Sequence, residues 1–296
     1  MAGVSLDQRD GWIWFDGKFV DWKEAKVHVL THAMHYGSGV FEGLRAYGGE
    51  IYKLRQHSDR LINSARILDF QIPYSAQDID DACLAVLKKN GLTDAYIRPI
   101  AWRGSHELGF YARGNPVHLA IAAWEWPSYF KPEERLKGIR LTVSKWRRPA
   151  PDTSPFDAKA TGLYMICTLS KHAATDAGYT DALMLDYRGQ IAEATGANIF
   201  FHRHRDLHTP TPDCFLDGIT RQTVIELARA HGLKVIVRPM LPQEMAEFDE
   251  CFLTGTAAEV TPVAEIDAYR FTPGEVCRAM MDAYSAKVQP RRAAAE

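Results

Sequence analysis

Residues 155–202 read PFDAKATGLYMICTLSKHAATDAGYTDALMLDYRGQIAEATGANIFFH and combine a lysine loop, a helical pattern and strand patterns. Lys159 lies among small residues just before a predicted helix at about 163–177. Two strand-like runs follow, at 181–187 and 190–202, and a short turn joins them as a hairpin. A helix and strands alternating in this way favour a mixed α and β fold.

Local signals outside this stretch add further elements. Trp12-Ile13-Trp14-Phe15 leads into Asp16-Gly17, a strong hairpin dipeptide. A helix is predicted at about 76–90, because Ser75 and Asp78 fit a capping box before it and Gly91 ends it. Other strands are predicted at about 95–102, 118–126, 141–145, 234–239 and 250–256, and other helices at about 58–68 and 219–231.

The run PSYFKPEERLKG at 127–138 is typical of an interdomain connection, since it contains two prolines and five charged residues. We therefore predict a smaller N-terminal α/β domain at 1–128, a linker at 129–137 and a larger C-terminal domain at 138–296.

The composition is that of a globular protein, with 46% hydrophobic and 24% charged residues among 296. The formal net charge of -2 gives no basic field for nucleic acid, and no apolar run is long enough for a membrane span. The five cysteines lack the spacing of a zinc site or a disulfide framework. We expect a cytoplasmic protein without a metal site, and neither nucleic acid nor a membrane as a partner.

Four segments contain residues suited to chemistry, and each also has an ordinary structural interpretation. Lys159 is either a partly desolvated nucleophilic amine or a surface charge. Glu193 is either a buried carboxylate facing a cationic partner or a solvated strand residue. Residues 218–221 open a helix that either binds a phosphate or is simply capped, and residues 254–259 form either an anion-binding turn or a plain tight turn.

Taken together, these segments resemble the branched-chain aminotransferases of the fold-type IV pyridoxal-phosphate enzymes, from about Gly11 to Asp267. The resemblance rests on several blocks in a fixed order, which are more specific together than any one of them. These blocks are 35–37, 40–43, 95–99, 158–160, 193–198, 218–221 and 255–262.

The resemblance implies a two-domain architecture like that of D-amino-acid aminotransferases, with pyridoxal 5'-phosphate (PLP) held by the C-terminal domain. Lys159 would attach the cofactor covalently and then move the proton between the substrate Cα and the cofactor C4′. Glu193 would keep the pyridine nitrogen protonated, and Tyr164 would bond the phenolic oxygen. The resemblance assigns the remaining cofactor contacts to Arg60, Gly196, Leu216, Gly218, Ile219, Thr220 and Thr256.

The implied reaction moves the amino group of leucine, isoleucine or valine to 2-oxoglutarate, giving 2-oxo acids and L-glutamate. Arg98 would receive the distal carboxylate, and Tyr96 with the Thr256-Ala257 turn would receive the α-carboxylate. The other implied substrate contacts are Tyr36, Phe41, Phe110, Trp126 and Tyr129. Members of the family assemble as homodimers or larger homo-oligomers, and we expect the same here.

The stretch 106–114, HELGFYARG, departs from the family pattern, since Phe110 stands where a small aliphatic residue is usual. The alternatives are therefore a related transaminase with shifted specificity, for aromatic L-amino acids, D-amino acids or (R)-amines, or an aminodeoxychorismate lyase. A non-catalytic protein that binds a phosphate-bearing ligand is a further alternative.

Overall fold

The computed structural model describes residues 5–126 and 136–290, which form two compact units. The units are residues 5–126 with 158–162 and Pro290, and residues 136–157 with 163–289. Each unit contains helices and one β-sheet, so the mixed α and β fold predicted from the sequence is confirmed. The predicted linker at 129–137 lies mostly outside the described residues, and the predicted domain division stays a prediction.

The first unit is built on an antiparallel sheet in the order β2-β1-β7-β6-β4-β5, with β3 also paired to β6. Its strands are β1 (Trp12–Phe15), β2 (Lys18–Asp21), β3 (Val40–Phe41), β4 (Leu44–Tyr47), β5 (Glu50–Ile51), β6 (Ala95–Arg103) and β7 (Val117–Glu125). The hairpin predicted at Asp16-Gly17 is confirmed, because β1 and β2 pair directly across it.

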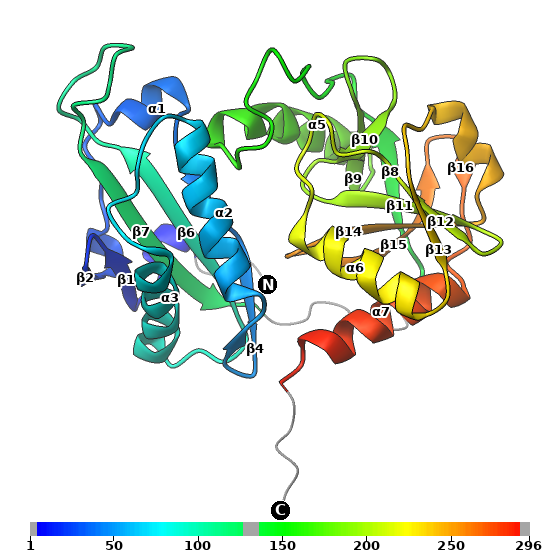
Figure 1. Ribbon diagram of the computed structural model, residues 1–296, viewed down its shortest axis with the longest axis horizontal. Coiled ribbons are helices and arrows are strands. Elements are labelled where there is room, and N and C mark those ends of the chain that lie inside the picture. The colour runs from blue at the N-terminus through cyan, green and yellow to red at the C-terminus, as the bar shows by residue number, and fades with distance from the viewer. Residues whose placement is uncertain (1–4, 127–135, 291–296) are drawn as a thin grey trace, which may run out of the picture. The chain divides into compact units, whose positions relative to one another are not determined.

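The two longer helices of this unit, residues 54–67 and 76–90, cover one face of this sheet and run side by side in Figure 1. The helices of this unit are α1 (His32–Tyr36), α2 (Leu54–Ile67) and α3 (Ala76–Asn90), with short 3-10 turns η1 (Leu6–Gln8) and η2 (Trp22–Glu24). The predicted bounds of α3 are confirmed, because its capping box and a left-handed Gly91 are both present. The buried core between helices and sheet includes Leu61, Ile79, Ile97 and Leu119.

The second unit contains a mixed sheet in the order β10-β9-β8-β15-β14-β11-β12-β13, with β16 paired to β15. Its strands are β8 (Ile139–Val143), β9 (Asp181–Leu185), β10 (Ile191–Ala194), β11 (Asn198–Arg203), β12 (Asp206–Thr209), β13 (Lys234–Val237), β14 (Glu250–Gly255), β15 (Glu259–Ile266) and β16 (Tyr269–Arg270). The pairs β8 with β9, β8 with β15 and β12 with β13 are parallel.

The helices of the second unit are α5 (Met165–Asp176), α6 (Ile219–Ala230) and α7 (Glu275–Val288), with the 3-10 segment η4 (Pro242–Glu247). The 3-10 segment η3 (Thr161–Tyr164) begins in the first unit and ends in the second. Figure 1 shows α6 and α7 packed beside each other. In the part of the chain that the structure describes, no helix combines the length and the apolar character needed to cross a membrane.

The stretch 190–202 differs from its prediction as a single strand. It forms two strands, β10 and β11, because a turn at 195–197 interrupts it and Ala194 N donates to the Ala197 carbonyl at 2.8 Å. The sequence pattern was too uniform in apolar residues to reveal this break. The turn directs Glu193 on β10 and Asn198 on β11, two strands successive in the chain, toward each other.

Helix α7 begins without a capping side chain of its own, and Glu250 on β14 takes that role. Its buried carboxylate accepts hydrogen bonds from the backbone amides of Gly274, Val276 and Cys277, at 3.0, 3.2 and 2.7 Å. A negative charge at a helix N-terminus is also favoured by the helix dipole. Glu250 therefore ties α7 to the sheet.

We predict that Glu250→Ala lowers the free energy of unfolding by about 3 kcal/mol, because one buried and two partly buried amides lose their acceptor. The matched control is Glu247→Ala, which removes an exposed carboxylate bound to Arg203 and should cost less than about 1 kcal/mol. Urea denaturation followed by circular dichroism measures both. Equal losses in the two variants would contradict the capping role.

Candidate active site

The segment around Lys159 belongs to the first unit, although the predicted C-terminal domain at 138–296 surrounds it in sequence. The Lys159 amide donates to Ser64 Oγ on α2 at 3.0 Å, and its carbonyl accepts from the Phe41 amide at 3.1 Å. Ala160 also forms an antiparallel bridge with Val40. These bonds to the first unit's backbone and to α2 fix the main chain of the lysine.

Glycines make this close approach possible. Gly162 N donates to the Gly37 carbonyl at 3.0 Å, and a Cβ on Gly162 would lie only 2.9 Å from that oxygen. Gly37 has a φ of 62°, and a Cβ on Gly39 would press on Thr161 at 3.3 Å. The glycines of the run 37–39 therefore serve the packing of the lysine segment.

The Phe41 ring joins the predicted catalytic lysine to a predicted substrate residue. Lys159 Nζ lies 4.9 Å from the ring centroid, and Arg98 Cζ lies 4.8 Å from it. Arg98 Nη2 also donates to the Tyr96 hydroxyl at 2.9 Å. The Tyr96 ring in turn contacts Trp126 at 5.2 Å between centroids. These five predicted site residues thus form one continuous set of contacts.

Gly43 gives the Tyr96 hydroxyl its space, because a Cβ on this glycine would lie 2.1 Å from that oxygen. The sequence block 40–43 therefore includes a glycine whose missing side chain defines the place of a predicted substrate residue.

Arg60 lies on α2 and is held by a residue that the sequence analysis did not select. Its Nε and Nη2 donate to the two oxygens of Glu42, at 2.6 and 2.9 Å. His57 Nδ1 donates to the same carboxylate at 2.7 Å. Burial raises the pKa of Glu42, but Arg60 and His57 lower it further, so its pKa lies well below the usual range and the group is ionised.

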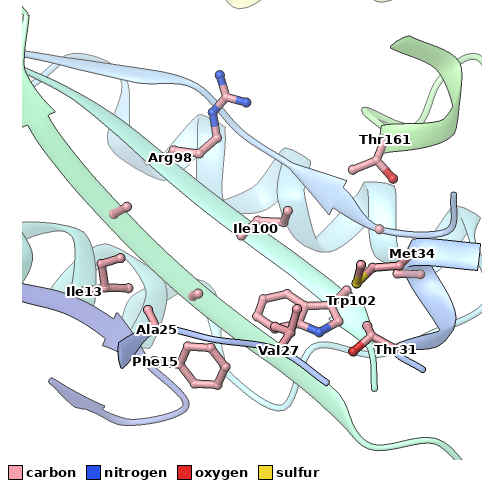
Figure 2. Close-up of a pocket in the computed structure, with 14 residues that line it drawn as sticks. Ile13, Phe15, Ala25, Val27, Thr31, Met34, Arg98, Ile100, Trp102 and Thr161 are labelled. Carbon is pink, nitrogen blue, oxygen red and sulfur yellow. The ribbon is translucent and has the colours of Figure 1, made fainter. Parts of the chain in front are cut away.

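The face of the sheet opposite α2 and α3 carries an apolar groove of about 410 Å³ (Figure 2). Arg98, Ile100 and Trp102 follow one another along β6 in this view, Met34 lies beside Trp102, and Thr161 lies on a separate segment to the side of the strand. Arg98 is the predicted substrate residue that lines this groove.

Two other predicted substrate residues form a separate pair. The rings of Tyr36 and Phe110 lie 5.2 Å apart, and the Tyr36 hydroxyl donates to the Leu108 carbonyl at 2.9 Å. Phe110 is nevertheless 90% exposed. Tyr129 lies outside the described residues.

In the second unit, Glu193 is buried and held on both oxygens. Arg148 Nη2 donates to one oxygen, and Asn198 Nδ2 donates to the other at 3.2 Å. Burial lowers the pKa of the Arg148 guanidinium, but Glu193 raises it further, so the pair is ionised. Of the two interpretations left open for Glu193, the buried carboxylate with a cationic partner is the one observed.

The N-terminus of α6 lies beside this carboxylate. Asn198 Nδ2 also donates to the Leu216 carbonyl at 3.0 Å, and a Cβ on Gly218 would lie 2.2 Å from Asn198 Oδ1. Gly218 is the N-cap, and no side chain caps the helix. The first amides of α6, at the buried residues Ile219 and Thr220, are therefore suited to an anion.

The remaining predicted residues lie on turns and at a helix start. The turn 256–258, with Thr256 and Ala257, joins β14 to β15, and a Cβ on Gly255 would lie 3.3 Å from the Gly196 carbonyl. The two turns of Gly196 and Thr256 are therefore neighbours. Tyr164 is the N-cap residue of α5 and is partly buried.

The residues present fit a phosphate-bearing pyridine aldehyde. Lys159 provides a primary amine, Glu193 provides a buried carboxylate for a ring nitrogen, and α6 provides an uncapped N-terminus for a phosphate. The buried Thr254 hydroxyl, opposite Asn198 in the sheet, has no hydrogen-bond partner among the described residues and adds a polar group.

Sequence reasoning missed the supporting residues of both units, which are Glu42, His57, Ser64, Arg148 and Asn198. Glu42 and Asn198 were inside the recognised blocks, and a charged residue in the apolar run 40–43 was a usable signal. Arg148 lies next to a proline-rich loop, and nothing in its neighbours indicates a buried partner.

Comparisons with known proteins agree on one family. The family described as amino-transferase class IV matches residues 39–266. The branched-chain-amino-acid aminotransferase of Pseudomonas aeruginosa is 43% identical over 275 residues, 92% of this chain and 90% of that protein. The crystal structure of the T.th. branched-chain amino acid aminotransferase with pyridoxamine 5'-phosphate superposes with a TM-score of 0.93 at 40% identity, covering 96% of both chains.

A second structure of the T.th. enzyme, complexed with N-(5'-phosphopyridoxyl)-L-glutamate, has a TM-score of 0.91 at 39% identity and also covers 96% of both chains. The resemblance and the fold-type IV architecture predicted from the sequence are thereby confirmed. This chain belongs to the class IV aminotransferases.

Proposed function

We propose that this chain uses PLP to transfer the amino group of leucine, isoleucine or valine to 2-oxoglutarate, giving branched-chain 2-oxo acids and L-glutamate. The observation that carries the proposal is the Phe41 ring, which has Lys159 Nζ and Arg98 Cζ within 4.9 and 4.8 Å of its centroid. An apolar ring beside the amine suits an aliphatic side chain, and the guanidinium beside the same ring suits a distal carboxylate. The names of the relatives and their complexes support this choice.

When bound, PLP supplies an electron-deficient ring that accepts the electron pair left at the substrate Cα. Lys159 anchors the cofactor through its amine and moves the proton at the substrate Cα. Glu193, kept ionised by Arg148 and Asn198, holds a proton on the pyridine nitrogen. Tyr164 orients the ring through its phenolic oxygen.

The phosphate is assigned to a set of donors that complement a dianion. This set comprises Arg60, the amides of Ile219 and Thr220 at the start of α6, and Thr256, with Gly196, Leu216 and Gly218 shaping the space around the cofactor.

The substrate is assigned to residues that separate its charged and apolar parts. Tyr96 and the Thr256-Ala257 turn hold the α-carboxylate, and Arg98 holds the distal carboxylate of glutamate or 2-oxoglutarate. The apolar side chain is assigned to Tyr36, Phe41, Phe110, Trp126 and Tyr129.

A homo-oligomer is supported by apolar surface on the first unit. Met34, which lines the groove of Figure 2, is 62% exposed, and the aromatic side chains of Phe110 and Tyr111 are 90% and 75% exposed. Apolar surface of this kind marks a contact with another protein, and we assign it to a second copy of this chain.

The cysteines and the net charge bear on the compartment of the enzyme and on the kind of molecule it binds. All five cysteines are free thiols, which supports a reducing compartment such as the cytoplasm. The formal net charge of -2 favours small amino acids and 2-oxo acids as partners over nucleic acid.

A shifted specificity is the second candidate function, and the observation that favours it is the aromatic Phe110. The two residues before it are held, because His32 Nε2 donates to the Gly109 carbonyl at 3.1 Å and the Tyr36 hydroxyl donates to the Leu108 carbonyl. A large ring presented in a fixed place can narrow an apolar pocket or favour aromatic substrates. Assays should therefore include L-phenylalanine and (R)-1-phenylethylamine beside L-leucine.

The role of Lys159 predicts a covalent label. After borohydride reduction with PLP, mass spectrometry should find the cofactor on the peptide that contains Lys159, and Lys159→Ala should lose both the label and at least about 10³-fold in kcat. Lys145→Ala, at an exposed lysine, is the control and should keep both. A label on another lysine, or an active Lys159→Ala variant, would refute the assignment.

The role of Arg98 predicts a selective change in affinity. Arg98→Met should raise KM for 2-oxoglutarate by at least about tenfold and KM for L-leucine by less than about threefold, because only the former loses a charged partner. Arg103→Met, on the same strand, removes a guanidinium bound to the Leu68 and Asp69 carbonyls and should lower stability without this selectivity. Equal increases for both substrates in Arg98→Met would argue against the assignment.

The proposed assembly predicts a measurable mass. Light scattering should give at least twice the chain mass of 33.3 kDa, and Met34→Asp should shift the protein toward the monomer because it places a charge in the apolar groove. Met165→Asp, at a methionine of similar exposure on α5, serves as the control. A monomeric wild-type protein would exclude the oligomer.

A further inference from the structure

The buried cluster of Glu42, His57 and Arg60 has a geometry that stability alone does not account for. Glu42 is fully buried, and the Arg60 side chain is 18% exposed. A buried ion pair is weak support for stability, because removing two charges from water offsets much of their attraction. The bidentate contact, in contrast, fixes the plane and direction of a guanidinium very effectively.

Glu42 holds only one edge of the Arg60 guanidinium. It accepts from Nε at 2.6 Å and from Nη2 at 2.9 Å, so Nη1 lies on the side of the fork that Glu42 does not hold. His57 fixes Glu42 from behind through Nδ1 at 2.7 Å. Burial, with the nearby charges of Arg60 and Lys159, lowers the pKa of His57 even though Glu42 acts to raise it, so a neutral imidazole donates this bond and leaves the positive charge on Arg60.

The same helix face also holds the lysine. His57, Arg60 and Ser64 recur on α2 at intervals of three and four residues, which places them along one side of the helix. Ser64 accepts from the Lys159 amide at 3.0 Å. The Glu42 backbone is fixed too, since its amide donates to the Pro99 carbonyl at 2.9 Å. The guanidinium and the lysine main chain are therefore set by one rigid frame.

We propose that Glu42, supported by His57, is a positioning residue that directs Arg60 toward the phosphate of the cofactor and thereby sets the affinity of the protein for phosphate-bearing ligands. The inference rests on the proposed function, because it takes PLP as the ligand. It assigns to Glu42 and His57 a role that acts through Arg60.

The test compares ligands with and without a phosphate. Dissociation constants of the full-length apoprotein are measured for PLP and for pyridoxal, and thermal shifts are measured with inorganic phosphate. Glu42→Gln should weaken PLP binding by at least about tenfold and reduce the shift with phosphate, while pyridoxal binding changes by less than about twofold. His57→Asn should change PLP binding in the same direction by a smaller factor, and it remains informative if Glu42→Gln does not fold.

A double variant and a matched control separate positioning from general damage. In an Arg60→Met background, Glu42→Gln should leave the ratio of PLP to pyridoxal affinity unchanged, because its target is gone. Asp80→Asn removes another buried carboxylate, which pairs with Arg55 at 2.7 Å and Ser58 at 2.6 Å on the same helix. This control should lower stability and leave the ratio unchanged.

The outcomes distinguish the inference from the function on which it rests. If Glu42→Gln weakens PLP and pyridoxal equally, or if Asp80→Asn reproduces its effect, the positioning role is wrong while the proposed function stands. If the wild-type protein binds no PLP at Lys159, the proposed function fails and the inference fails with it.

Discussion

The backbone bonds of the lysine segment are the constraint on which the rest of the site depends. The chain leaves the second unit for residues 158–162 and returns to it at 163, and in between both the amide and the carbonyl of Lys159 are bonded to the first unit. A catalytic amine on a flexible loop would lose the precision that such chemistry needs. The glycines at 37 and 162 allow this contact, and the helix face that includes Ser64 completes it.

Each unit contains a buried carboxylate that is paired with an arginine. Glu42 in the first unit is paired with Arg60, and Glu193 in the second is paired with Arg148, in each case with a further donor, His57 or Asn198. An unpaired buried carboxylate would take up a proton, whereas these pairs keep a fixed negative charge. The charge of Glu42 orients the guanidinium of Arg60. The charge of Glu193 is itself available to the nitrogen of a pyridine ring.

The parts of this fold that were predictable from sequence are those with local signals. The capping box at Ser75, the helix end at Gly91 and the hairpin at Asp16-Gly17 each depend only on residues a few positions away in the sequence. The division of 190–202 into two strands was missed because both halves are apolar and pair with different neighbours. The partners of Arg148 and Glu42 lie 45 and 18 residues away, and only the folded chain brings such groups together.

The arrangement around Phe41 explains how one pocket can serve two dissimilar side chains. A ring that contacts a cation gains a modest electrostatic attraction, so it can hold Arg98 in place without neutralising its charge. The Tyr96 hydroxyl accepts from Arg98 as a neutral group, and this too leaves the positive charge intact. In the proposed function, an aliphatic substrate side chain therefore packs on the Phe41 ring. A substrate carboxylate pairs with the Arg98 guanidinium, whose positive charge is not neutralised by another residue's charge in these contacts. In the proposed assignment, the apolar ring and the guanidinium thus provide separate places for the two kinds of side chain.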